Sequence, residues 1–251
     1  MNKEILRIEN LTANVTENKD IEILHNIDLK INYGEVHVIM GPNGSGKTTL
    51  ANVIMDNPEY TVTNGKIFFE GEDITDLSTD KRAKKGIFMS FQNPMAVSGI
   101  SVENFIRTAK NSIEDENVSV LKFKKELKKE MEKLSFDESY ASRYLNEGFS
   151  GGEMKKNEIL QMIMLNPKLA ILDETDSGLD VDATRIVAEG IKRFINEDKA
   201  VLIITHHREL IKNIKPDFVH VIINGKFIMT GGDSLVDKIE DEGFNWLKEE
   251  V

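Results

Sequence analysis

A glycine-rich run at residues 41–49 constrains the fold of this chain more than any other feature. It reads GPNGSGKTT and satisfies the phosphate-loop pattern G-x-x-x-x-G-K-[ST]. A nearly continuous apolar stretch, EVHVIM at residues 35–40, precedes it, and apolar residues at helical spacing follow Lys47. This order of strand, loop and helix is the context that a phosphate-binding loop requires, and it argues against an incidental glycine-rich turn.

The residue types in this run match the chemistry of a triphosphate. Glycines allow backbone N–H groups to surround phosphate oxygens, Lys47 reaches the β- and γ-phosphates, and the Thr48 hydroxyl is a ligand for Mg²⁺. We therefore expect a nucleotide site with Mg²⁺, formed by Gly41, Pro42, Asn43, Gly44, Ser45, Gly46, Lys47, Thr48 and Thr49.

The rest of the pattern predicts an α/β fold. Short apolar strands recur at residues 169–174, 200–205 and 218–223, and a helical pattern at 182–196 separates the first two. Such alternation indicates a mostly parallel sheet with right-handed crossovers. The N-terminal segments alternate instead, as half-buried antiparallel strands do, and we expect Ile21, Ile23, Ile27, Leu29 and Ile31 to lie mostly on one side.

Residues 98–165 have a different character, helical and charged with no convincing strand. We interpret them as a helical subdomain inserted into one domain, whose core comprises residues 1–97 and 166–251. Within it, LKFKKELKKEMEKL carries glutamates among its lysines, which indicates a solvated helix face rather than a nucleic-acid or membrane patch. The apolar face of that helix is expected to hold Phe123, Leu127, Met131 and Leu134. A last helix is expected at 233–250.

Composition narrows the partners. The formal net charge of −11 opposes binding to nucleic acid and to anionic membranes. There are no cysteines, so thiolate metal sites and cysteine nucleophiles are excluded. No apolar window approaches the ~18 residues of a membrane-spanning helix, and the opening MNKEILRIEN lacks a signal-peptide core. We expect a cytoplasmic protein that neither inserts into a membrane nor binds nucleic acid.

Polar side chains follow two of these apolar strands and a further one, predicted at GIFMSF, residues 86–91. Asp173 and Glu174 end LAILDE, where Asp173 is placed to hold Mg²⁺ through water and Glu174 to orient or deprotonate an attacking water. Gln92 in MSFQNP is placed to sense the γ-phosphate or the metal, and His206 in LIITHH to contact the γ-phosphate. Taken singly, Gln92 and His206 are more often ordinary loop residues. Only the set gives them a function.

These motifs together resemble those of the ATP-binding cassette (ABC) ATPases, in order and in approximate spacing. The resemblance implies the cassette fold, with an N-terminal antiparallel β subdomain and an inserted helical subdomain. It also implies that Gly41 to Thr49 bind ATP, that Gln92, Glu174 and His206 are the Q-loop residue, catalytic base and switch histidine, and that Ser177 and Asp180 form the D-loop. The signature segment of the family matches Phe149, Ser150, Gly151, Gly152 and Glu153, which would contact the γ-phosphate bound by a second copy in an ATP-dependent homodimer.

The residues that occupy these motifs resemble one branch of that family more than the others. GFSGGEMKKNEILQM, LDETDSGLDVDA, KPDFVHVIINGK and GFNWL look like the soluble ATPases of the Suf iron–sulfur cluster assembly system. That resemblance implies a complex with SufB- or SufD-type scaffold proteins. Three departures from the wider family stand out. The segment TANVTENKD lacks an aromatic residue to stack on adenine, and Val15 is its nearest apolar candidate. Lys156 lies near the position at which many cassettes have Arg, and Gly178 replaces the Ala that is usual in the D-loop.

Three other functions remain open on the sequence alone. The chain has the same core as the ATP-binding subunit of a membrane ABC transporter. A nucleic-acid-directed ATPase would usually add a coiled coil or a second cassette, and a chain this short and acidic has neither. A nucleotide-binding regulator without turnover would not need Glu174. The segment at Ser150 also has a purely structural interpretation, since Ser150 and Glu153 fit the S-x-x-E capping box, followed on one helix face by Ile159, Met162 and Ile163.

Overall fold

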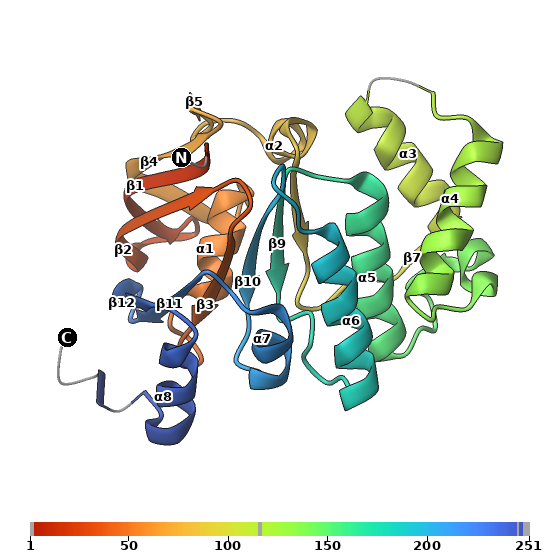
Figure 1. The fold of residues 1–251 in the computed structure, drawn as a ribbon. Helices are drawn as coiled ribbons and strands as arrows, with labels where there is room; N and C mark the ends of the chain where they lie inside the picture. Colours follow the sequence, from red (N-terminus) through yellow and green to blue (C-terminus); the bar gives the residue numbers. More distant parts are fainter. Residues whose placement is uncertain (1–2, 115–116, 245, 248–251) are drawn as a thin grey trace.

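A six-stranded sheet forms the centre of the computed structural model, which describes residues 3–114, 117–244 and 246–247. Its strand order is β12-β11-β3-β10-β9-β6, and all neighbours are parallel except the β11–β12 pair, a hairpin that turns at Asn224 and Gly225. The predicted mostly parallel α/β core is therefore confirmed (Figure 1). Its strands are β3 (Val36–Met40), β6 (Ile87–Ser90), β9 (Leu169–Asp173), β10 (Ala200–Ile204), β11 (Phe218–Ile223) and β12 (Lys226–Gly231).

A second sheet is antiparallel, in the order β2-β1-β4-β5. The expected buried side of β2 is wrong at its beginning, because Ile21 is 48% exposed whereas Leu24 is buried. Between the pairs Leu11↔Ile27 and Ala13↔Leu24, β1 advances by two residues and β2 by three. This bulge exchanges the two faces of β2, so the alternation cannot continue through it. The strands are β1 (Glu4–Val15), β2 (Asn18–Asn32), β4 (Tyr60–Phe69) and β5 (Glu72–Asp73).

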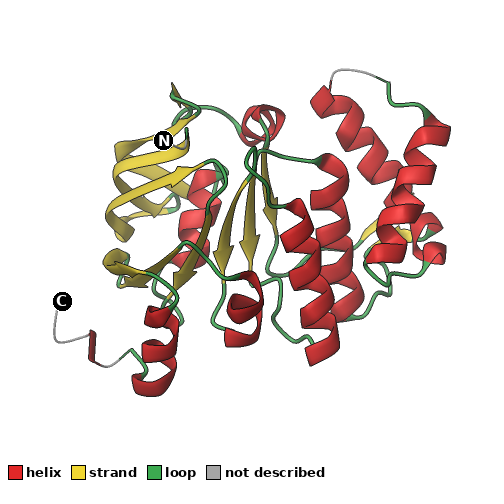
Figure 2. Ribbon diagram, viewed as in Figure 1, coloured by secondary structure: helices red, strands yellow, loops and turns green. Residues whose placement is uncertain are grey.

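Helices cover both faces of the core sheet (Figure 2). Helix α1 (Lys47–Ile54) lies between the core sheet and the antiparallel sheet, where both contribute to one apolar cluster. Helices α6 (Val181–Phe194), α7 (Arg208–Ile214) and α8 (Ser234–Glu242) contribute to the cluster on the other face. The predicted last helix is wrong beyond Glu242, because Gly243 takes a positive φ of 68° and ends α8. Residues 245 and 248–250 of that prediction lie outside the described residues.

The segment predicted to be helical contains α3 (Val102–Glu114), α4 (Val120–Lys133), a short 3₁₀ turn at Glu138–Ser142 and α5 (Gly151–Leu165). The predicted apolar face of α4 is buried as expected. The expectation of no strand is wrong, since β7 (Val97–Ser101) and β8 (Tyr144–Leu145) pair antiparallel across the segment. Within the described ranges, no helix combines the length and apolar character needed to cross a bilayer.

Helix α5 is not the one-faced amphipathic helix that its sequence indicates. Ile159 and Met162 are buried as expected, but so are the polar side chains of Lys155, Asn157 and Glu158. The helix lies between α6 and the outer helices α3 and α4, so it has neighbours on several sides (Figure 1). Its buried polar side chains consequently need partners within the protein.

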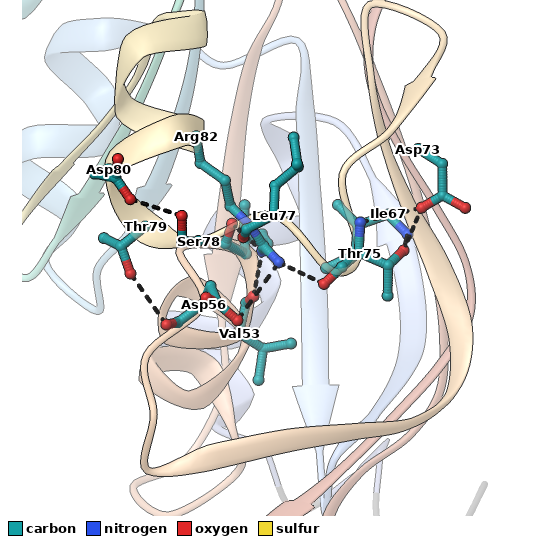
Figure 3. A network of polar contacts seen from close by, with 11 residues as sticks. Val53, Asp56, Ile67, Asp73, Thr75, Leu77, Ser78, Thr79, Asp80 and Arg82 are labelled. Atoms are coloured by element: carbon teal, nitrogen blue, oxygen red, sulfur yellow. Dashed lines mark hydrogen bonds and ion pairs between the residues drawn. The ribbon is translucent and has the colours of Figure 1, made fainter.

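A buried arginine joins α1 to the segment that follows β5. Arg82, on α2 (Thr79–Lys85), donates to the carbonyl oxygens of Val53 (2.9 Å) and Ile54 (2.8 Å) in the last turn of α1. It also donates to the carbonyl oxygens of Thr75 and Leu77, each at 2.7 Å (Figure 3). A cation at the carboxyl end of a helix satisfies carbonyl groups that have no partner within the helix. Arg82 therefore fixes the far end of the helix that begins at Lys47.

Candidate functional site

The glycine-rich run forms a tight loop between β3 and α1. Gly46 has a φ of 103°, and a Cβ atom at Gly41 would lie 2.2 Å from the carbonyl oxygen of Ile222, so neither position accepts a larger residue without movement. The Lys47 ammonium donates to the carbonyl oxygens of Gly41 (2.9 Å) and Pro42 (3.0 Å). Burial lowers the pKa of Lys47, which the charges of Glu174 and Asp173 oppose. A partly desolvated cation inside a glycine loop is well placed to bind a phosphate.

The two acids at the end of β9 differ in environment. Asp173 is fully buried, and burial raises the pKa of Asp173 to about 6. Its Oδ1 accepts a hydrogen bond from the Thr48 hydroxyl (3.3 Å), whereas its Oδ2 has no hydrogen-bond partner among the described residues. An unpartnered carboxylate oxygen beside a hydroxyl fits the oxygen donors that Mg²⁺ prefers. The structure thus brings together two of the residues predicted to hold the metal.

Two other predicted site residues, Gln92 and His206, converge on Glu174. Gln92 Nε2 donates to Glu174 Oε2 (2.6 Å), and His206 Nδ1 lies 3.7 Å from Glu174 Oε1. The Glu174 backbone has a φ of 46° and donates its N–H to the carbonyl oxygen of Ile204 (2.9 Å). Non-glycine residues rarely adopt this conformation, and it often occurs where a side chain must point into a site.

These groups surround a cavity of about 440 Å³. Ile23 of β2 lines it, rather than the expected Val15, which pairs with Asn18 and Tyr60 at the end of β1. The alternation in the sequence assigns Ile23 to the buried side of the strand and so does not distinguish it from a core residue. The other lining residues are Asn43, Gly44, Ser45, Gly46, Lys47, Thr48, Thr49, Gln92, Glu174 and His206.

The segment at Ser150 begins α5 with the predicted capping box. The Ser150 N–H donates to the Glu153 carboxylate (2.6 Å), and the Glu153 N–H donates to the Ser150 hydroxyl (3.4 Å). Phe149 is buried against Tyr140 and Phe136, which orients the turn. Figure 1 shows α5 and α1 on opposite sides of β9 and β10, so the turn and the phosphate loop of one chain lie apart.

The predicted D-loop follows Glu174. Ser177 donates its N–H to the Glu174 carbonyl (3.2 Å), and Asp180 caps α6 by accepting from the Ala183 N–H (2.8 Å). Between them Gly178 has a φ of 74°. Glycine adopts this conformation without strain, whereas alanine would be strained there.

Sequence reasoning missed the residues of α5 that hold the backbone around Gln92. Lys155 donates to the carbonyl oxygens of Phe91 (3.2 Å) and Gln92 (2.8 Å), and Glu158 accepts from the Phe91 N–H (3.0 Å). Burial raises the pKa of Glu158 to about 7. The available signal was weak, a pair of oppositely charged residues three positions apart on a helix that carries several other polar residues. Helix α5, which Ser150 caps, is consequently hydrogen-bonded to the Gln92 loop, the segment at residues 91–96 between β6 and β7.

Comparisons with known proteins agree with this geometry. A family model described as "ABC transporter" matches residues 24–177. The chain is 45% identical over 251 residues to the "Probable ATP-dependent transporter ycf16" of Trieres chinensis, covering 98% of this chain and 99% of that protein. It is 46% identical over 232 residues to "Vegetative protein 296" of Bacillus subtilis (strain 168), covering 92% and 89%. A nucleotide-free ATP-binding cassette from an ABC transporter superposes with a TM-score of 0.78 at 26% identity, with 98% of each chain covered.

Proposed function

This chain belongs to the ABC transporter family of ATP-binding cassettes, and from that premise we propose that it is a Mg²⁺-dependent ATPase of the SufC type. In this proposal ATP hydrolysis drives conformational change in a Suf-type iron–sulfur cluster assembly scaffold. The observation that carries the ATPase part is the convergence of Gln92, Glu174 and His206 on the cavity of the phosphate loop. The proposed place of action is the cytoplasm.

The nucleotide is proposed to bind along the loop from Gly41 to Thr49. Lys47, which now donates to two loop carbonyls, would exchange them for β- and γ-phosphate oxygens. Thr48, Asp173 and Gln92 are the proposed residues for Mg²⁺, which supplies charge neutralisation at the phosphates when bound. The unpartnered Oδ2 of the fully buried Asp173 supports this assignment.

Glu174 is proposed to act as the base that orients and deprotonates the attacking water. Gln92 holds one of its carboxylate oxygens and His206 lies near the other, so the carboxylate is oriented from two sides. His206 is 46% exposed on the cavity wall, where it can contact the γ-phosphate. Base, orienting groups and phosphate loop together match the arrangement that phosphoryl transfer to water requires.

The segment from Phe149 to Glu153 is proposed to complete the site of a second copy. Within one chain it lies across β9 and β10 from α1, so it is not placed at the cavity of its own chain (Figure 1). Its capping box leaves the first helical N–H groups of α5 free to face an anion. The expected assembly is an ATP-dependent homodimer in which Ser177 and Asp180 also lie near the twofold axis.

A scaffold protein of the SufB or SufD type is the proposed partner, because the motif sequences resemble those of the Suf ATPases. A surface for it lies beside the Gln92 loop, where a groove of about 260 Å³ is lined by Phe91, Met95 and Val97, among others. These three side chains are exposed and apolar. Such a patch, next to the γ-phosphate position, suits a partner that must move with the nucleotide state.

The alternative is the ATP-binding subunit of a membrane ABC transporter, which is favoured by the name of the Trieres chinensis relative, "Probable ATP-dependent transporter ycf16". An affinity pull-down of the full chain from its native cell, followed by mass spectrometry, separates the two. Recovery of a scaffold protein with the iron–sulfur assembly machinery supports the Suf function, and recovery of a polytopic membrane protein contradicts it.

The ATPase part has its own test. Glu174→Gln should lower kcat by about 10²-fold or more while leaving the affinity for ATP within a few-fold, because the base is lost and the phosphate loop is intact. The matched control is Glu147→Gln, an exposed carboxylate before the signature turn. Unchanged turnover in Glu174→Gln would show that this residue is not the base.

A further inference from the structure

Two segments that follow adjacent strands are joined at their beginnings. Residues 174–180 follow β9 and residues 205–207 follow β10, and the Glu174 N–H donates to the carbonyl oxygen of Ile204 (2.9 Å). Asp176, two positions after Glu174, accepts a second bond at Oδ2 from the Thr205 hydroxyl (2.7 Å). The same hydroxyl oxygen accepts from the His207 N–H (2.9 Å). The Thr205 side chain therefore joins Asp176 to the backbone that carries His206.

This bond lies in the interior. Thr205 is fully buried and Asp176 is 3% exposed. Burial raises the pKa of Asp176, which the Thr205 hydrogen bond opposes. No residue in the described part of the chain bonds to Asp176 Oδ1. A buried carboxyl group with one bonded and one unpartnered oxygen contributes little to stability, because its desolvation is only partly compensated. Its location then calls for a role other than packing.

The location suggests that role. Asp176 immediately precedes Ser177 of the D-loop, and its carbonyl oxygen accepts from the Leu179 N–H (3.3 Å). Thr205 immediately precedes His206, whose ring lies 3.7 Å from Glu174. A displacement of the D-loop would consequently move Thr205, and with it His206, because buried hydrogen-bonded groups shift together.

We propose that Asp176 and Thr205 are positioning residues that fix His206 relative to Glu174 and transmit the position of the D-loop to it. This inference rests on the proposed ATPase function and deepens it. When a second copy contacts Ser177 and Asp180, the bond between Asp176 and Thr205 places His206 for turnover. Neither residue contacts the nucleotide in this mechanism, so the affinity for ATP is unaffected.

The test compares three hydroxyl variants of the full chain. Thr205→Val removes the hydroxyl while keeping the shape of the side chain, and should lower kcat about 10-fold with the affinity for ATP unchanged. Thr205→Ser keeps the hydroxyl and should retain turnover within about twofold. Thr75→Val is the matched control, because the Thr75 hydroxyl likewise donates to a carboxylate, Asp73 Oδ1 (2.6 Å), and accepts from a backbone N–H, that of Ile67 (2.9 Å), in the segment that follows β5 rather than in the D-loop. It should lower the melting temperature without lowering kcat.

A double-mutant cycle with His206→Ala separates positioning from a structural role. If Thr205 acts through His206, Thr205→Val lowers kcat no further once His206 is absent, while its effect on melting temperature persists. Equal fold-losses in both backgrounds overturn the inference. Equal turnover in Thr205→Val and Thr205→Ser overturns it as well.

A readout independent of turnover keeps the two proposals distinguishable. The His206 ring resonance, assigned by its loss in His206→Ala, should shift in Thr205→Val and remain in place in Thr205→Ser and Thr75→Val. If the wild-type chain hydrolyses no ATP but this shift is seen, the proposed function fails and the positioning contact stands. If turnover is normal and the resonance is unmoved, the inference fails and the proposed function stands.

Discussion

Replacing Arg82 by methionine tests how much of the fold depends on one buried cation. The Arg82 side chain is 1% exposed, and its guanidinium makes four hydrogen bonds to backbone carbonyl groups, those of Val53, Ile54, Thr75 and Leu77 (Figure 3). Hydrogen bonds from a charged donor contribute about 1.5 kcal/mol or more each, so the four contribute about 6 kcal/mol. Burial lowers the pKa of Arg82, and removing the charge regains about 2 kcal/mol of that desolvation cost.

The expected loss for Arg82→Met is therefore about 4 kcal/mol, a large part of the 5–15 kcal/mol by which most domains are stable. Urea denaturation followed by circular dichroism measures it as a shift in midpoint at constant slope. Arg82→Lys keeps a cation with three donors and should lose about half as much. Asp56→Asn is the control, because the partly exposed Asp56 carboxylate lies 3.7 Å from the guanidinium and contributes under about 1 kcal/mol. A loss below about 1.5 kcal/mol in Arg82→Met would refute the assignment of four strong bonds.

Three further predictions concern pH and nucleotide affinity. Burial raises the pKa of Glu158 to about 7, so the free energy of unfolding of wild type should fall as the pH rises from 4.5 through 7. Glu158→Gln lacks this titration, and its free energy of unfolding should rise by about 3 kcal/mol relative to wild type from pH 4.5 to pH 8. Burial, with the neighbouring His37, lowers the pKa of His220 to about 4. As the pH falls from 6.5 to 4, the free energy of unfolding of wild type should therefore fall by about 3 kcal/mol relative to that of His220→Gln. Urea titrations at each pH measure both, and parallel profiles for variant and wild type would contradict them. Ile23→Tyr should tighten ATP binding about 2–10-fold by calorimetry, since an aromatic ring at the cavity wall can stack on a base, and unchanged affinity would place the base elsewhere.

The fold was predictable because its signals are local. A buried strand that runs into a glycine loop and then a helix is readable within twenty residues around Lys47, and strands that alternate with helices indicate a parallel sheet. Errors arose where a local pattern was interrupted. The bulge in β2 exchanged its faces near Leu24, and the β7–β8 pair joins residues more than forty positions apart, which short windows do not detect.

The same division holds for the candidate site. Polar residues at the ends of parallel strands meet at one edge of the sheet, so the strand ends alone predicted that Asp173, Glu174 and His206 lie together, whereas a role for His206 was predicted only from the whole set of motifs. Lys155 could not, because its bonds to the Gln92 loop span more than sixty residues of chain and depend on how α5 packs. Ile23 was indistinguishable from a core residue until the cavity beside it was seen.

The sequence by itself determined the phosphate loop, the order of the strands along the chain and the acids at their ends, because each depends on residue type and on spacing within one element. The tertiary structure alone decided which groups contact each other across elements. The examples are hydrogen bonds made by buried polar side chains. Arg82 bonds to the end of α1, Lys155 and Glu158 bond to the backbone around Gln92, and Asp176 bonds to Thr205. The need of a buried polar group for a partner can be stated from the sequence, but the partner is fixed only by packing, since burial itself arises only when the chain has folded.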